Sequence, residues 1–328
     1  MISKKKVFMR KILTILLACL LICSLFACQK RENEAVRVYT LTGTTGFGMA
    51  KLMDDAANGN AALSYQFTKE TDPTLVRDAL LSGDADIAAL PTNVASTLYN
   101  ATNGGVRVLA LNTKGVLHLV TKEALAVTAL SELSGKTVYC PAQNPAFITA
   151  ALLREAKVVN VQLDSTTYAK AEELREAVAN GYVDYAVLPE PMVTIAVNVA
   201  RQNDLALAAS LDLTAEWEKY FPANSLVQGC VVARTAFIEA HPDQIAAFLA
   251  EYKASIAYVM GDYTKGGDVI ARTGIFSSAA VAQNALPRCN LCYIDGTAMQ
   301  AALSAFLTQM PLGSIGGALP GEDFYHLP

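Results

Sequence analysis

The sequence has few residues of the kinds on which most enzymes and metal proteins depend. Its 328 residues include only three histidines, at 118, 241 and 326, and one tryptophan. No GxSxG nucleophile elbow, P-loop or HExxH zinc motif occurs in it. A zinc site needs four well-spaced Cys or His ligands, and none of the histidines lies near a cysteine in the sequence. We therefore expect no enzymatic activity, no metal and no cofactor.

An excess of basic charge is also missing. Residues 1–27 hold five of the 26 basic residues and no acid, so the remainder has a net charge near −9. A nucleic-acid-binding protein needs a basic face that releases counterions from phosphates. Nucleic acid is therefore excluded as a partner. Apolar residues make up 52% of the chain, which is enough to bury a sizeable core.

The N-terminus has the pattern of a secretory signal. Basic residues up to Lys11 precede the apolar stretch at 12–27, which would span about 24 Å as a helix, less than the roughly 30 Å of a membrane core. The segment Leu25-Phe26-Ala27-Cys28 then resembles a bacterial lipobox, with Phe26 a less usual residue. We predict a signal peptide at 1–27, lipidation at Cys28 and a tether at 28–34; the alternative is an uncleaved membrane anchor. Both interpretations place the rest of the chain outside the cytoplasm at the cell membrane.

Four cysteines remain outside this N-terminal region: Cys140, Cys230, Cys289 and Cys292. The last two form a CxxC motif without a second pair. In an exported protein they are either a small disulfide or two buried thiols, and the sequence favours the thiols.

The body contains an internal repeat. Residues 37–56 align with 137–156, and residues 77–91 align with 175–189, at offsets of 100 and 98. Chance similarity between two α/β segments is the alternative, because helix–Gly–strand patterns recur widely. Two related halves in succession predict two α/β lobes.

Each half alternates strands with helices. Val36–Leu41 is rich in β-formers, Met49–Ala56 has apolar residues at helical spacing, and Asp86–Leu90 is an apolar strand. Asp72-Pro73 and Gly83 have the residue types of a helix start and a helix end. Such alternation predicts mostly parallel sheets whose ligand crevices lie at the carboxyl ends of the strands.

The last third of the chain is expected to return to the first half. A strand at Leu226–Arg234 precedes a long helix beginning at His241-Pro242. The roughly 70 residues that follow are too few for a third core. The chain therefore crosses between the lobes at least twice, which makes a hinge.

Repeat-equivalent loops predict the functional site. These are residues 42–47 and 90–93 in the first half, and 141–145 and 189–192 in the second. They offer glycines, hydroxyls, amides and one carboxylate, which is the chemistry of recognition. Phe47 or Trp217 could add an apolar wall. Ligand contact competes with plain turn geometry for the glycine loop, and with a helix-start role for Glu190. His118 is interpreted as a strand residue.

Four segments carry a resemblance to a known family: LTGTTGFGMAKLM, ALLSGDADIAALPTNVASTL, YAVLPEPMVTIAV and VVARTAFIEAHPDQIAAFL. Over residues 36–310 they resemble solute-binding lipoproteins of ABC importers, in the nitrate, sulfonate, taurine and thiamine-precursor (NMT1/THI5-like) group. The resemblance implies a two-lobe type II periplasmic-binding fold, with lobe I at 35–112 and 234–328 and lobe II at 113–233. It also implies ligand contacts at Thr44, Thr45, Gly46, Phe47, Thr92, Asn93, Gln143, Asn144 and Glu190. Asn290, in a stretch that recurs in this group, is a further candidate.

The resemblance implies a monomer that works with a permease and an ATPase. The loops lack Arg, Lys and His, and Glu190 disfavours an anion. The sequence therefore favours a neutral or cationic nitrogen heterocycle over sulfonate or nitrate. Two other functions stay open: a sensor or surface-interaction lipoprotein, and an enzyme related to the thiamine-pyrimidine synthase, whose expected His and Cys-rich motif is missing.

Overall fold

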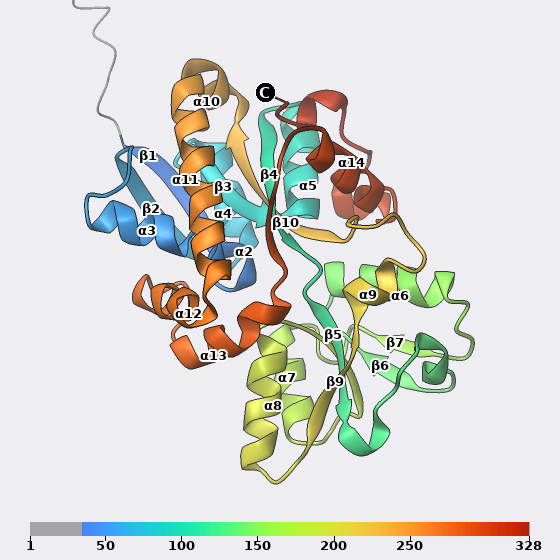
Figure 1. Cartoon of the computed structure of the whole chain (residues 1–328). Helices are drawn as coiled ribbons and strands as arrows, with labels where there is room; N and C mark the ends of the chain where they lie inside the picture. Colours follow the sequence, from blue (N-terminus) through green and yellow to red (C-terminus); the bar gives the residue numbers. More distant parts are fainter. Residues whose placement is uncertain (1–34, 328) are drawn as a thin grey trace, which may run out of the picture. The chain divides into compact units, whose positions relative to one another are not determined.

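The structure, a computed structural model, describes residues 35–327 (Figure 1). The predicted signal peptide, tether and lipidation site at Cys28 lie outside the described residues. Residues from Val36 onward form one compact unit that holds two β-sheets with helices packed on them.

The first sheet has six strands in the order β11-β4-β10-β3-β1-β2. Their bounds are β1 Val36–Leu41, β2 Tyr65–Glu70, β3 Ile87–Pro91, β4 Val106–Lys114, β10 Val227–Arg234 and β11 Leu291–Ile294. Strand β1 runs parallel to β2 and β3, whereas β10 is antiparallel to both β3 and β4. We call this sheet and the helices packed on it the first lobe.

The second sheet has five strands in the order β7-β6-β8-β5-β9. Their bounds are β5 Leu117–Lys122, β6 Thr137–Tyr139, β7 Gln162–Asp164, β8 Tyr185–Pro189 and β9 Leu207–Asp212. Strand β6 is parallel to β7 and β8, and β5 is antiparallel to β8 and β9. This sheet and its helices form the second lobe.

The two sheets repeat one topology. Strands β2-β1-β3-β10-β4 of the first correspond in order to β7-β6-β8-β5-β9 of the second. The chain crosses from β4 to β5 and returns between β9 and β10, so each sheet contains a crossing strand antiparallel to its neighbours. The crossing strand makes each sheet mixed, but most strands run in one direction, as the sequence predicted. These are β1, β2, β3 and β4 in the first sheet and β6, β7, β8 and β9 in the second. The lobe bounds stay a prediction, except that β10 lies in the first sheet although its residues up to 233 were expected in lobe II.

Most helices belong to the segments before β5 and after β10. Before β5 these are α2 Thr44–Phe47, α3 Ala50–Ala57, α4 Pro73–Ser82 and α5 Thr92–Thr102; after β10 they are α10 Thr235–Ala240, α11 Pro242–Gly261, α12 Tyr263–Arg272, α13 Ala279–Ala285 and α14 Gly296–Leu307. Between β5 and β10 lie α6 Asn144–Glu155, α7 Ala171–Ala179, α8 Met192–Gln202 and α9 Leu213–Trp217. Short 3₁₀ turns are η1 Glu123–Leu125, η2 Leu130–Leu133, η3 Leu286–Arg288, η4 Leu312–Ile315 and η5 Glu322–Phe324.

Helix α4 forms as its sequence predicts. The Asp72 carboxylate accepts a hydrogen bond from the Thr74 backbone N–H, and Pro73 occupies the first helical position. Gly83 ends the helix with a φ of 83°, a left-handed conformation that favours glycine. These residues therefore specify where α4 begins and ends.

The C-terminal segment returns to the first lobe. Helix α11 buries Phe248 and Tyr252, and β11 then adds a strand beside β4. The last described residues lie along the same sheet, where the His326 backbone N–H donates to the Val108 carbonyl at 2.9 Å.

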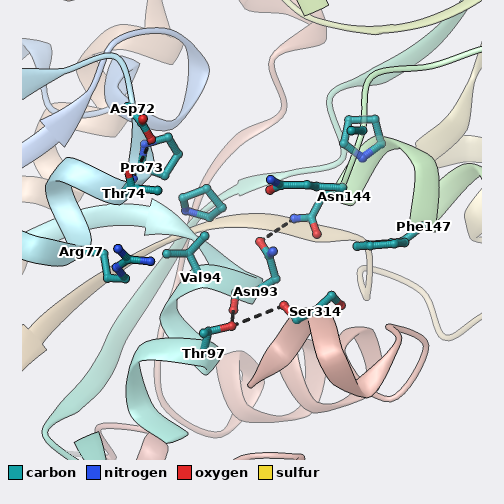
Figure 2. Close-up of a pocket in the computed structure, with 14 residues that line it drawn as sticks. Asp72, Pro73, Thr74, Arg77, Asn93, Val94, Thr97, Asn144, Phe147 and Ser314 are labelled. Atoms are coloured by element: carbon teal, nitrogen blue, oxygen red, sulfur yellow. Dashed lines mark hydrogen bonds between the residues drawn. The ribbon is translucent and has the colours of Figure 1, made fainter. Parts of the chain in front are cut away.

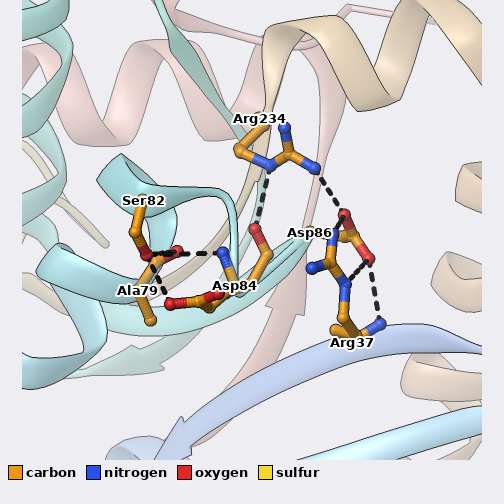
Figure 3. Close-up of polar contacts among 7 residues, drawn as sticks. Arg37, Ala79, Ser82, Asp84, Asp86 and Arg234 are labelled. Carbon is orange, nitrogen blue, oxygen red and sulfur yellow. Dashed lines mark hydrogen bonds and ion pairs between the residues drawn. The ribbon is translucent and has the colours of Figure 1, made fainter.

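An ion-pair cluster joins three strands of the first sheet (Figure 3). The Asp86 carboxylate, just before β3, accepts hydrogen bonds from Arg37 of β1 and from Arg234 at the end of β10. Burial alone would raise the pKa of Asp86, but these hydrogen bonds outweigh it and hold the pKa below its ordinary value. The repeat-equivalent carboxylate of the second lobe, Asp184, pairs with Lys122 at a more exposed position.

Among residues 35–327, no helix combines the length and the apolar character that crossing a membrane requires.

Candidate functional site

A cavity of about 510 Å³ lies between the two lobes. Its first-lobe wall consists of Asp72, Pro73, Thr74, Arg77, Pro91, Asn93, Val94, Thr97 and Ser314, and its second-lobe wall of Ala142, Gln143, Asn144, Pro145 and Phe147. Figure 2 shows Asn144 and Phe147 facing the first-lobe side chains across this space. The volume falls within the range of small-molecule sites in proteins.

Three helices begin at the cavity. Pro73, Thr92 and Asn144 are the first residues of α4, α5 and α6. Asp72 caps α4, whereas α5 and α6 have no side-chain cap. Uncapped backbone N–H groups at a helix start can donate hydrogen bonds to a ligand.

An amide pair connects the lobes beside the cavity. The Asn144 Nδ2 group donates to Asn93 Oδ1 at 2.8 Å, and both side chains are buried. The other amide atom of Asn144, Oδ1, is buried without a hydrogen-bond partner. Leaving a buried acceptor unpaired costs about 1–3 kcal/mol, so this contact between the lobes is incomplete.

The charged residues near the cavity are already paired. Arg77 directs its guanidinium toward Val94 in Figure 2, but its Nε lies 2.8 Å from the carboxylate of Asp78. Hydrogen bonds from Thr74 lower the pKa of Asp72, so this acid is ionised and engaged as a helix cap.

Glu190, the carboxylate that the sequence singled out, is also paired. Its Oε1 lies 2.5 Å from Arg288 Nε, and its Oε2 accepts a hydrogen bond from the Thr194 hydroxyl at 2.8 Å. Its backbone carbonyl accepts a hydrogen bond from the Thr44 hydroxyl of the first lobe at 2.7 Å. Glu190 therefore joins the lobes and does not offer a free negative charge.

The predicted contacts fall into three groups. Asn93, Gln143 and Asn144 line the cavity, and Thr44 meets Glu190 at a second contact between the lobes. The remaining four are Thr45, Gly46, Phe47 and Thr92, and none of them is among the residues that line the cavity. As ligand contacts, all nine stay a prediction.

Packing alone accounts for two of these residues. Phe47 is fully buried and packs edge-on against Phe276, so it is a core residue and not a cavity wall. A side chain at Gly46 would place its Cβ 1.8 Å from the Leu41 carbonyl oxygen, so this glycine is required by close packing of α2 on β1. Trp217 is likewise fully buried in the core.

Thr92 and Asn290 stabilise the fold near the crossings. The Thr92 hydroxyl donates to the Val227 carbonyl of β10 at 2.9 Å. The Asn290 side chain donates to the Gly115 carbonyl, in the link between β4 and β5, at 2.6 Å. Both side chains therefore hold crossing segments in place.

Sequence reasoning missed several cavity residues. Arg77 and Thr97 lie one helical turn after Pro73 and Asn93, and that spacing could have identified them. Phe147 follows Asn144 by three residues on the same helix face. Ser314 comes from the C-terminal segment, and only tertiary packing brings it to the cavity.

The remaining candidates for chemistry are buried or half-buried and unreactive. Cys289 and Cys292 are free thiols, and burial raises the pKa of both, to about 12 for Cys292. His118 lies in β5, and burial lowers its pKa despite the nearby charges of Asp212 and Glu190. Within the described part of the chain, no three His, Cys, Asp or Glu side chains are grouped to hold a metal ion.

Comparisons with known proteins place these features in context. The model of a family described as NMT1/THI5 like matches residues 60–263. No curated protein sequence matches the chain.

Three solved structures illustrate the structural similarity. An ABC transporter structure from Parabacteroides distasonis has a TM-score of 0.73 and 23% identity, over 90% of this chain and 98% of that one. The ligand binding component of an ABC-type import system from Staphylococcus aureus has a TM-score of 0.66 and 14% identity, over 90% and 97%. The periplasmic aliphatic sulphonate binding protein of Escherichia coli has a TM-score of 0.64 and 14% identity, over 84% and 87%. These similarities confirm the fold that the sequence resemblance implied.

Proposed function

Because the chain belongs to the NMT1/THI5-like family, we propose that it is an extracytoplasmic solute-binding protein of an ABC importer. It would capture a small molecule between its lobes and deliver it to a permease. The observation that carries this proposal is the 510 Å³ cavity whose walls come from both lobes. A ligand there touches both lobes at once, so binding can be coupled to their relative movement.

The names of the similar proteins point to the same class of function. They name an ABC transporter, a component of an ABC-type import system and a sulphonate binding protein. Their shared fold is what makes ABC import the activity to test first. The lipid anchor at Cys28, the location at the membrane surface and the monomeric state belong to the proposal and rest on the sequence alone.

The pairing of charges supports a neutral ligand. Glu190 is paired with Arg288 and Arg77 with Asp78, and the Asp72 carboxylate caps α4. A charged ligand would find each of these side chains already paired, and burying an ion without a countercharge is costly.

The hydrogen-bonding groups of the cavity are amides and hydroxyls. Asn93, Gln143 and Asn144 offer both donors and acceptors, and Phe147 and Val94 add apolar surface. We propose a neutral nitrogen heterocycle, since its ring atoms match such groups and its faces match the apolar side chains. A cationic heterocycle, which the sequence also allowed, is disfavoured because Arg288 neutralises Glu190.

The proposed cycle involves no chemical conversion. A ligand that contacts both lobes only when they are closed shifts the equilibrium toward the closed form. Moving the population from 1:99 to 99:1 takes about 5.5 kcal/mol of differential affinity. The closed form would then dock on the permease.

The first test is native mass spectrometry of residues 28–328 with Cys28→Ser, purified from cells grown on rich medium. We expect a mass excess that is lost on mild denaturation, and a higher melting temperature when that molecule is added back. A thermal-shift panel of neutral heterocycles, amines and sulfonates follows. Binding of sulfonates alone would refute the neutral ligand, and steady conversion of any bound compound would refute the function.

A matched pair of variants tests the site. Asn144→Ala should weaken ligand binding about tenfold, since a lost hydrogen bond is worth roughly 1 kcal/mol or more. Asn203→Ala changes an exposed asparagine at the end of α8, outside the cavity, and should bind as the unmodified protein does. Equal affinities of the two variants would place the ligand elsewhere.

A further inference from the structure

A partly buried ion pair connects the lobes, and neither of its residues lines the cavity. The Glu190 side chain is 0% exposed, and Arg288, which reaches it, is 40% exposed. Arg288 Nε donates to Glu190 Oε1, and Arg288 Nη2 donates to the Thr194 hydroxyl at 2.8 Å. Thr194 in turn donates to Glu190 Oε2 through both its hydroxyl and its backbone N–H. The carboxylate is thus satisfied on both oxygens.

These partners come from different lobes. Arg288 ends η3, directly before β11 of the first sheet, whereas Glu190 follows β8 of the second sheet and Thr194 lies in α8. Thr44 of α2 adds a further hydrogen bond from the first lobe to the Glu190 carbonyl. Two separate first-lobe segments therefore hold one residue of the second lobe.

The repeat provides an internal comparison. Asn144 corresponds to Thr44 at the offset of 100, and each residue contacts the opposite lobe, Asn144 through Asn93 and Thr44 through Glu190. The contact between Asn144 and Asn93 is uncharged, consists of a single hydrogen bond and leaves Asn144 Oδ1 unpaired. Of the two contacts, that of Glu190 also includes a cation, Arg288. Arg288 lies in the C-terminal segment, which follows both halves of the repeat.

We propose that Arg288 is a positioning residue whose ion pair with Glu190 latches the two lobes together. In the closed arrangement the buried carboxylate depends on Arg288 for its countercharge. If Arg288 is neutral, the carboxylate is left buried without compensation, and separating the lobes lets water hydrate it. The latch therefore biases the lobes toward closure, and a ligand needs to supply correspondingly less of the closing free energy.

The test measures the distance between the lobes without any ligand. Spin labels are attached to Leu81→Cys in α4 and Tyr182→Cys in the second lobe, which are exposed positions, in residues 28–328 carrying Cys28→Ser and Cys292→Ser. Pulsed electron resonance then gives the distribution of distances. Arg288→Gln should raise the ratio of open to closed molecules about tenfold, since close charge pairs couple by roughly 1.5 kcal/mol or more.

A matched control separates latching from general stability. Arg272→Gln breaks the ion pair between Arg272 and Asp54. Both of these residues belong to the first lobe. It should leave the distance distribution unchanged. A distribution for Arg288→Gln equal to that of Arg272→Gln would overturn the proposal, even if the melting temperature falls.

Two further variants keep the test decisive. Arg288→Lys retains the cation and should restore part of the closed population. Thr44→Val removes one hydrogen bond across the lobes without touching the charges, so it tests the same contact if Arg288→Gln does not fold. It should shift the distribution in the same direction, by less. No shift in Thr44→Val and Arg288→Gln together would refute the latch, and neither outcome depends on the proposed function.

Discussion

Replacing Asp86 by Asn removes the charge on which three strands of the first sheet converge. Asp86 accepts four hydrogen bonds: from the Arg37 backbone N–H, from Arg37 Nε and Nη2, and from Arg234 Nη2, at 2.6 to 3.1 Å. Asp86 is 4% exposed, so water does not replace these donors in the folded protein. Asp86→Asn leaves two guanidinium groups facing a neutral amide.

The size of the effect follows from burial. Breaking a buried ion pair by removing one partner costs about 3–5 kcal/mol, because the other charge stays uncompensated. Both arginines are partly exposed and regain some hydration, so we expect about 3 kcal/mol. The repeat-equivalent change Asp184→Asn breaks an exposed pair with Lys122 and should cost less than about 1 kcal/mol.

Urea unfolding followed by circular dichroism measures both variants against the unmodified protein. The pH dependence adds a second readout. The pKa of Asp86 lies below its ordinary value of 3.8, so its contribution is present above that value and is lost as the pH falls through the folded pKa. The deficit of Asp86→Asn should be largest near pH 7 and shrink below about pH 4. Equal losses for Asp86→Asn and Asp184→Asn, or a deficit independent of pH, would refute this reasoning.

Three other predictions concern the interior. Gly46→Ala should cost about 3 kcal/mol or more in urea unfolding, because the new Cβ meets the Leu41 carbonyl oxygen. Burial lowers the pKa of His118, so the unfolded chain takes up this proton at a higher pH than the folded one. Stability should therefore fall as the pH drops below about 6.5, and His118→Asn should flatten that slope. Trp217 is fully buried and donates to the Ser225 hydroxyl at 2.8 Å, so Trp217→Phe should cost about 2 kcal/mol and remove the tryptophan fluorescence.

Local signals in the sequence determined the elements and their repetition. Asp72-Pro73 and Gly83 specify the two ends of α4, and the spacing of apolar residues specifies the buried face of α11. The aligned segments at 37–56 and 137–156 predicted two related halves, and the two sheets have the same strand order. These features depend on neighbouring residues, whose backbone and side-chain preferences are encoded locally.

Pairing between distant residues was decided only by the tertiary structure. The local pattern did not identify the crossing strands β5 and β10 as antiparallel to their neighbours, since strand direction depends on which lobe a strand enters. The sequence left Glu190 open between ligand contact and a helix-start role, and only the fold brings Arg288 to it from 98 residues away. Ion pairing, burial and close packing depend on distances between side chains in space. Local sequence patterns do not give these distances for residues that lie far apart in the chain.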